Sequence, residues 1–146
     1  MAASTEDSTV LHGSVVAFGG RGILILGASG AGKSALALAL LGRGAALVAD
    51  DRVHLARRGT ALVARAPEAI AGLIEARGVG ILRLPAQSEA VVTLAVDLDR
   101  APEARMPQGV TIPCLGVDLE LISGRGIPNL DLLLSFFVQN GRAFPD

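Results

Sequence analysis

The sequence predicts an α/β domain in which a mixed β-sheet is flanked by few helices. Short apolar runs of the length of buried strands recur at residues 22–26 (GILIL), 46–50 (ALVAD) and 91–98 (VVTLAVDL). Only residues 34–41 (SALALALL) and 131–139 (DLLLSFFVQ) have the composition and length of helices. Strands therefore outnumber helices, in a chain whose 146 residues suit one domain.

Glycine-rich turns divide the first half of the chain. Residues 10–18 (VLHGSVVAF) are rich in β-formers, and residues 19–22 (GGRG) provide a turn before the strand at 22–26. The helix at 34–41 is made of strong helix formers and ends at the glycines of residues 42–44.

The second half begins with a hairpin. Residues 53–57 and 60–65 flank Arg58-Gly59, a dipeptide suited to a tight turn. The remaining elements follow in order: a helical turn at 67–71, one or two strands within 73–84 around Gly78, the strand at 91–98, a proline-rich loop at 100–109, a further strand region at 112–122, and a closing helix at 131–139 with Asn129 or Asp131 as its cap.

Composition excludes several classes of protein. The 13 basic and 14 acidic side chains give a net charge of −1, which argues against nucleic acid or an anionic membrane as a partner. No apolar run approaches the roughly 18 uncharged residues of a membrane helix. We expect the polar residues 1–8 to form a disordered leader and residues 9–146 a single domain. Cys114 is the only cysteine, so we expect a small core residue, no internal disulfide and a cytoplasmic protein.

A glycine-rich motif follows the first apolar strand. Residues 27–34 (GASGAGKS) fit the pattern G-x-x-x-x-G-K-[ST], and Lys33 is the only lysine among the 13 basic residues. Glycines allow backbone N–H groups to surround phosphate oxygens, the lysine reaches the β and γ phosphates, and the serine offers its hydroxyl to Mg²⁺. The alternative is an ordinary turn in a chain with 18 glycines, but the strand before the motif and the helix after it favour a nucleotide-phosphate site. Its predicted binding residues are Gly27, Ala28, Ser29, Gly30, Ala31, Gly32, Lys33 and Ser34.

Two adjacent carboxylates, Asp50 and Asp51, stand at the end of the strand at 46–50. Ligands of open α/β sheets collect at the carboxyl ends of strands, and neighbouring strand side chains point to opposite sides. One aspartate is therefore available to a metal and the other to an acceptor hydroxyl, from which it would take a proton. Which of the two is the base stays open, and an aspartate-bearing turn at the entry of the hairpin is the alternative.

Three other residues have competing interpretations. Glu75 lies in an apolar stretch with Arg77 two residues later on the expected strand face, where the two would form a structural ion pair. His12 lies in the first β-rich segment, where a packed or surface histidine is the default interpretation.

The order of the motifs resembles that of one family. Leu11-His12-Gly13 is followed by GILILGASGAGKS at residues 22–34, LVADDRV at 47–53 and APEAIAGLIEARGVGIL at 66–82. Over residues 10–98 the chain resembles the catalytic domain of HPr kinase/phosphorylase, the bacterial enzyme that acts on a serine of the phosphocarrier HPr. The resemblance implies a P-loop-containing kinase domain of the HPr kinase type.

The resemblance also implies roles for individual residues. Lys33 and its loop would bind the phosphates of ATP, and Ser34 and Glu75 would hold Mg²⁺. Asp51 would accept the proton of the HPr serine with Asp50 in support. In the reverse reaction, a dephosphorylation that consumes phosphate and to which phosphate or pyrophosphate would belong, Asp51 would return a proton. The sequence leaves open whether ATP or pyrophosphate is the preferred donor.

Two further roles follow from the resemblance. His12 matches the active-site histidine of the family, near the phosphates. Arg77 and Gly78 belong to a segment that the family uses in both directions of the reaction.

The chain departs from the family pattern in several places. Full-length members carry an N-terminal domain, and their phosphate loop continues with an acidic residue where this chain has Ala35. Beyond Leu98 the resemblance fades: Gly124-Arg125-Gly126 is a partial match to a G-R-N segment, and the C-terminal helices are reduced to residues 131–140. Short relatives of this kind occur in alphaproteobacteria, where an HPr-like carrier of the nitrogen-related phosphotransferase system is the expected partner. The sequence leaves a homo-oligomer open.

Two other functions compete with a serine protein kinase. A nucleotide-binding regulatory module that has lost turnover would fit the faded C-terminal part. A kinase of a small metabolite would need an arginine-bearing lid, for which the chain offers only Arg57-Arg58.

Overall fold

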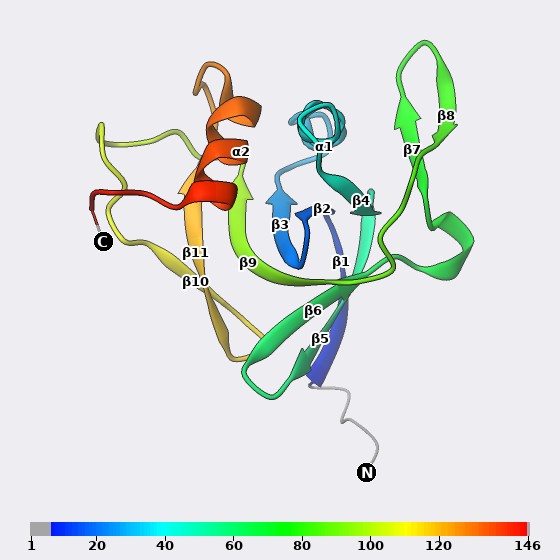
Figure 1. Ribbon diagram of the computed structural model, residues 1–146, viewed down its shortest axis with the longest axis horizontal. Coiled ribbons are helices and arrows are strands. Elements are labelled where there is room, and N and C mark those ends of the chain that lie inside the picture. The colour runs from blue at the N-terminus through cyan, green and yellow to red at the C-terminus, as the bar shows by residue number, and fades with distance from the viewer. Residues whose placement is uncertain (1–6, 146) are drawn as a thin grey trace.

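The computed structural model describes residues 7–145, which form a curled β-sheet with two helices on one face (Figure 1). The elements, in chain order, are β1 (Ser8–His12), β2 (Ser14–Phe18), β3 (Arg21–Leu26), α1 (Lys33–Leu41), β4 (Ala46–Ala49), β5 (Arg52–Arg58), β6 (Ala61–Arg65), the short 3-10 helix η2 (Glu68–Ile70), β7 (Leu73–Ala76), β8 (Gly80–Arg83), β9 (Ala90–Asp97), β10 (Thr111–Cys114), β11 (Val117–Ser123) and α2 (Leu130–Asn140).

The main sheet is mixed. Its strands follow the order β1-β5-β6-β9-β3-β2-β4, and β11 pairs with β9 on one side and β10 on the other. The pairs β3–β9 and β9–β11 are parallel, so the carboxyl ends of these three strands meet at one edge. The other pairs are antiparallel.

The curl of the sheet arises from one long paired ribbon. Strand β1 pairs with β5 and strand β2 pairs with β4, and both pairs are antiparallel. The first chain continues from β1 to β2 through Gly13, and the second from β4 to β5 through Asp50 and Asp51. Because β2 also pairs with β3 and β5 with β6, this ribbon connects both ends of the strand order and the sheet bends round on itself.

Both faces of the sheet are buried. One cluster, which includes Val15, Leu24 and Leu55, draws its side chains from strands alone. The other, which includes Val16 and Ile25, packs the sheet against α1 and α2. Successive residues of β2 and β3 alternate between the two clusters, which explains why these strands read as continuous apolar runs.

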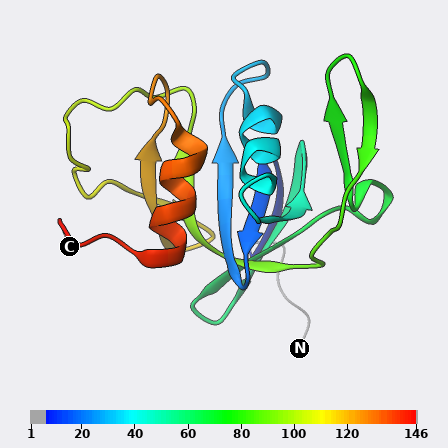
Figure 2. The same ribbon diagram turned by 45° about the horizontal axis from the view of Figure 1, so that its top comes forward.

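The two helices cover the same face of the sheet, and the β7–β8 hairpin stands apart as a second, two-stranded sheet (Figure 2). Ile74 of β7 is buried and joins the cluster beneath the helices. None of the helices within residues 7–145 has both the length and the apolar character needed to cross a membrane.

Most of the expected elements are confirmed, with differences in their boundaries. Ser8 begins β1 instead of ending a leader, and residues 1–6 of that expected leader lie outside the described part of the chain. The expected turn at 19–22 is shorter, because β3 already begins at Arg21, which pairs with Phe18 of β2. The strand expected to end at Asp50 ends at Ala49.

Two regions that the sequence did not divide into separate strands each form a hairpin. Residues 73–84 form β7 and β8 around a turn that contains Gly78, at φ 84°. Residues 112–122 form β10 and β11 around Leu115 and Gly116, both at positive φ. Asn129 occupies the N-cap position of α2, but its side chain makes no capping hydrogen bond.

Candidate functional site

The glycine-rich motif connects β3 to α1, as its sequence predicts. The backbone takes φ values of 154° at Gly27, 86° at Gly30 and 102° at Gly32, which side chains with a Cβ rarely adopt. A Cβ at Gly27 would lie 3.0 Å from the Cβ of Ala31 and 3.3 Å from that of Leu98, because the loop folds tightly over the end of β9. We call residues 27–34 the phosphate loop.

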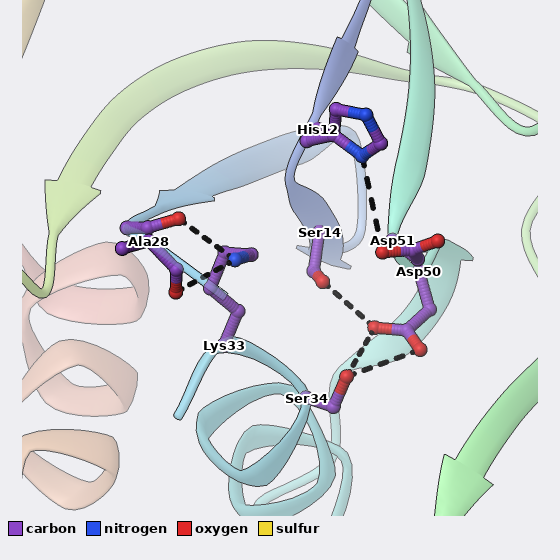
Figure 3. A network of polar contacts seen from close by, with 8 residues as sticks. His12, Ser14, Ala28, Lys33, Ser34, Asp50 and Asp51 are labelled. Carbon is purple, nitrogen blue, oxygen red and sulfur yellow. Dashed lines mark hydrogen bonds and ion pairs between the residues drawn. The ribbon is translucent and has the colours of Figure 1, made fainter. Parts of the chain in front are cut away.

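Lys33 lies against the inner side of this loop (Figure 3). Its Nζ donates to the carbonyl oxygen of Gly27 at 2.7 Å and to that of Ala28 at 3.1 Å. The thin lysine stem allows one compact charge to enter the curve of the loop, which the planar fork of an arginine fits less well.

Asp50 is joined to the phosphate loop through a hydroxyl. The Oγ of Ser34, at the start of α1, donates to Asp50, at 2.9 Å from Oδ1 and 3.2 Å from Oδ2. A second hydroxyl, that of Ser14 in β2, donates to Oδ1 at 2.7 Å (Figure 3). Only 6% of Asp50 is exposed, so its carboxylate lies at the buried end of the site.

Asp51 points away from Asp50, as the sequence predicts, although both residues lie in the bend between β4 and β5 and not in a strand (Figure 3). Its side chain is 73% exposed, and Oδ1 lies 4.0 Å from Nδ1 of His12, which is 74% exposed. The backbone of Asp51 is left-handed, at φ 69°, and its carbonyl oxygen accepts a hydrogen bond from the N–H of Gly13. The bend in the paired ribbon therefore presents Asp51 and His12 to solvent beside the buried Asp50.

The structure does not join Glu75 to this group. Glu75 is exposed on β7, opposite Ile81 of β8, and makes no side-chain hydrogen bond or ion pair within the described residues. The ion pair considered for Glu75 and Arg77 is not formed, because Arg77 lies in the turn after β7 and not on its strand face.

Sequence reasoning missed two residues that contact the site. Asp99 accepts a hydrogen bond from the N–H of Ala28 at 2.8 Å, and its own N–H donates to Oδ1 of Asp97 at 2.8 Å. Both aspartates come at the carboxyl end of β9, which is parallel to β3, so the pairing of these strands was the signal that could have identified them. The other missed residue is Ser14, whose place opposite Asp50 depends on the register of β2 and β4.

The donor set fits Mg²⁺. Within residues 7–145 no group of three or more His, Cys, Asp or Glu side chains could hold a metal ion by itself. Mg²⁺ instead usually takes one or two protein oxygens together with substrate phosphates and water. The hydroxyl of Ser34 and the carboxylate of Asp50 are such oxygens, and they adjoin the phosphate loop.

Comparisons with known proteins agree on one family. The family described as HPr Serine kinase C-terminal domain matches residues 3–93. An HPr kinase/phosphorylase of Acidovorax sp. (strain JS42) is 35% identical over 92% of this chain and 47% of its own length. That of Clostridium acetobutylicum is 39% identical over 82% of this chain and 40% of its own length. The chain thus spans about half the length, or less, of these curated relatives.

A solved structure extends the similarity to the fold. The HPr(Ser) kinase/phosphatase of Coxiella burnetii superimposes with a TM-score of 0.79 at 29% identity. The match covers 90% of this chain and 95% of that one, so it includes most of the C-terminal part, beyond the residues that the family model matches. The sequence match to the Acidovorax relative, over 92% of this chain, also extends past Leu98, where the resemblance was expected to fade.

Proposed function

Since this chain belongs to the HPr serine kinase C-terminal domain family, we propose that it transfers the γ-phosphoryl group of ATP, with Mg²⁺, to a serine of an HPr-like phosphocarrier protein. One observation supports this activity above the others. A phosphate loop that carries Lys33 and Ser34 lies within one hydrogen bond of Asp50, and the next residue, Asp51, faces solvent, where a protein substrate can reach it. Nucleotide binding alone would not need the exposed second carboxylate.

Different residues bind the phosphates and the metal ion. The N–H groups of the phosphate loop and the ammonium of Lys33 hold the β and γ phosphates. The hydroxyl of Ser34 and the carboxylate of Asp50 hold Mg²⁺, which neutralises charge on the phosphates when bound. The resemblance assigns Glu75 to the same ion, and that assignment remains a prediction.

Asp51 acts as the base of the transfer. It takes the proton of the acceptor serine while the serine Oγ forms a bond to the γ phosphorus and the bond to the β–γ bridging oxygen breaks, leaving ADP. In the reverse direction an oxygen of inorganic phosphate forms a bond to the phosphorus of the phosphoserine and the bond from that phosphorus to the serine Oγ breaks. Asp51 returns a proton to the departing serine oxygen, and pyrophosphate is the other product. We assign His12, 4.0 Å from Asp51, to contact with the same phosphate or to the orientation of this carboxylate. We assign Arg77 to the acceptor side, since it lies in an exposed turn, and we place the reaction in the cytoplasm, where ATP is available.

Phosphoryl transfer to a purified HPr-like carrier tests this function. The protein is incubated with γ-labelled ATP and either Mg²⁺ or EDTA, and with a carrier whose acceptor serine is intact or replaced by alanine. We expect label on the intact carrier alone and only with Mg²⁺.

Other outcomes decide against the proposal in different ways. Tight binding of ATP and Mg²⁺ with no label on any carrier favours the regulatory module. Label on a small metabolite in place of the carrier points to the metabolite kinase. Label that persists on the alanine carrier contradicts the assigned acceptor.

A further inference from the structure

We propose that Ser14 is a positioning residue for the metal half of this site, acting through Asp50. The inference rests on the proposed function, because it assumes that Asp50 and Ser34 hold Mg²⁺. Within the described residues the side chain of Ser14 makes no hydrogen bond with the phosphate loop or with the exposed Asp51; its one side-chain hydrogen bond goes to Oδ1 of Asp50 at 2.7 Å.

Burial explains why this contact matters to both partners. Ser14 is 0% exposed and precedes the core residues Val15, Val16 and Ala17 in β2, so its hydroxyl has no access to water. Asp50 is a carboxylate at 6% exposure without a Lys, Arg or His in ion-pair distance among the described residues. Buried carboxylates are normally paired with a cation, and two neutral hydroxyls offset only part of the loss of water.

The carboxylate therefore keeps capacity for a cation. An ionised carboxylate has about four acceptor positions, of which two hydroxyl groups occupy a part. Both hydroxyls approach Oδ1, whereas Oδ2 receives only the longer contact from Ser34, at 3.2 Å. Ser14 thus fixes Oδ1, the oxygen nearer to the hydroxyl of Ser34, and leaves Oδ2 with the larger share of free acceptor positions.

Ser14 and Ser34 differ in the structural elements that fix their positions. Ser34 belongs to the phosphate loop and is shared between the carboxylate and the proposed ion. Ser14 belongs to the paired ribbon, where the pairing of Val15 with Ala49 places it opposite Asp50. It is therefore held by the backbone of the sheet, whatever the loop does.

The bend of the ribbon reinforces this placement. A Cβ at Gly13 would lie 3.0 Å from the carbonyl oxygen of Ile25, so the chain passes close to β3 immediately before Ser14. The hydrogen bond from Ser14 to Asp50 comes from a residue that does not itself bind the ion. Hydrogen bonds of this kind orient a metal ligand, and their loss typically lowers metal affinity or activity about 10- to 100-fold.

The test measures the Mg²⁺ dependence of ATP binding, apart from turnover. ATP affinity is determined by calorimetry at increasing Mg²⁺ and in EDTA, for the wild type and for Ser14→Ala, which removes one atom and adds none. We expect Ser14→Ala to need about tenfold more Mg²⁺ for half-maximal tightening of ATP, with affinity in EDTA within about twofold of the wild type.

Two other variants distinguish the positioning role of Ser14 from its contribution to core packing. Ser135→Ala is the matched control, since Ser135 is also buried, at 5% exposure, and among residues 7–145 its hydroxyl bonds only within α2, to Gln139. It should leave the Mg²⁺ dependence unchanged. Ser14→Cys retains a weak donor at the same place and should give a smaller shift than alanine, which keeps the test usable if the alanine variant folds poorly.

The outcomes distinguish this inference from the proposed function. An unchanged Mg²⁺ dependence in Ser14→Ala, or a loss of ATP affinity that is equal with Mg²⁺ and EDTA, overturns the positioning role. Wild-type ATP binding that ignores Mg²⁺ overturns it together with the metal assignment. Mg²⁺-dependent binding that responds to Ser14 but is never followed by phosphoryl transfer sinks the proposed function and supports the inference.

Discussion

Replacing Asp51 by asparagine separates the chemistry of the site from its structure. The side chain of Asp51 is 73% exposed, and its contact with the equally exposed His12 is 4.0 Å long, so the pair contributes little to stability. The backbone is left-handed, at φ 69°, a conformation that Asn tolerates as well as Asp. We therefore expect the free energy of unfolding of Asp51→Asn to change by no more than about 0.5 kcal/mol.

The same substitution should remove most of the phosphoryl transfer. A positioned base contributes about 10²- to 10⁴-fold to a rate, which corresponds to roughly 2.7 to 5.4 kcal/mol in the barrier. Asp51→Ala should lose as much activity and also about 1 kcal/mol of stability, because alanine has a Cβ and no polar group to favour the left-handed backbone. Asp51→Gly relieves that strain and should be at least as stable as the alanine variant while equally inactive.

Single-turnover transfer to the carrier and thermal unfolding, measured on the same preparations, check these expectations. The reasoning is refuted if Asp51→Asn keeps more than about a tenth of the wild-type rate. It is also refuted if the losses of activity follow the losses of stability across the three variants, since the role of Asp51 would then be structural.

Three further changes test other parts of the structure. Lys33→Ala should weaken ATP binding about 10- to 100-fold, the value of a charged hydrogen bond, and unchanged affinity by calorimetry would contradict the role of the loop. Asp99→Asn keeps an acceptor for the N–H of Ala28 but removes a negative charge beside the phosphates; we expect modestly tighter ATP binding at low salt, an effect that should fade as salt is raised, and weaker binding at low salt would argue against it. The hydrogen bond from Arg43 lowers the pKa of Asp131 below its usual 3.8, so Asp131→Asn should cost about 0.5 kcal/mol at neutral pH. This contribution is present above the unfolded pKa and is lost as the pH falls through the lower folded value, so unfolding curves of the two proteins should converge in acid and stay apart near neutrality.

Local patterns were sufficient to predict the phosphate loop. Its glycines, Lys33 and Ser34 are contiguous, and the strand and helix on either side follow from composition. These features depend on neighbours within a few residues, and the sequence contains them in full. The sequence also predicts that Asp50 and Asp51 point to different sides, but in the structure they do so in the bend between β4 and β5, with a left-handed backbone at Asp51, and not by strand alternation.

Features that depend on strand pairing could not be predicted. The contact of Ser14 with Asp50 requires the register of β2 on β4, and that of Asp99 with Ala28 requires β9 to lie parallel to β3. The curl of the sheet likewise results from one ribbon continuing past Gly13, which no stretch of sequence encodes by itself. Glu75 was assigned to the metal from a resemblance in sequence, whereas its place in space depends on how the β7–β8 hairpin sits.

In the bent ribbon, the role of each aspartate depends on its position in the register of β2 and β4. One extra residue in β4 would move Asp50 out of the position opposite Ser14, because the pairing of Val15 with Ala49 defines that position. The carboxylate of Asp50 would lose the hydroxyls of Ser14 and Ser34, although the composition of the site would be unchanged. A single insertion at residues 46–49 should therefore disturb the site more than point substitutions at Asp50 and Asp51, and insertions should be tolerated less there than in the exposed turn at Gly59-Thr60, which follows β5.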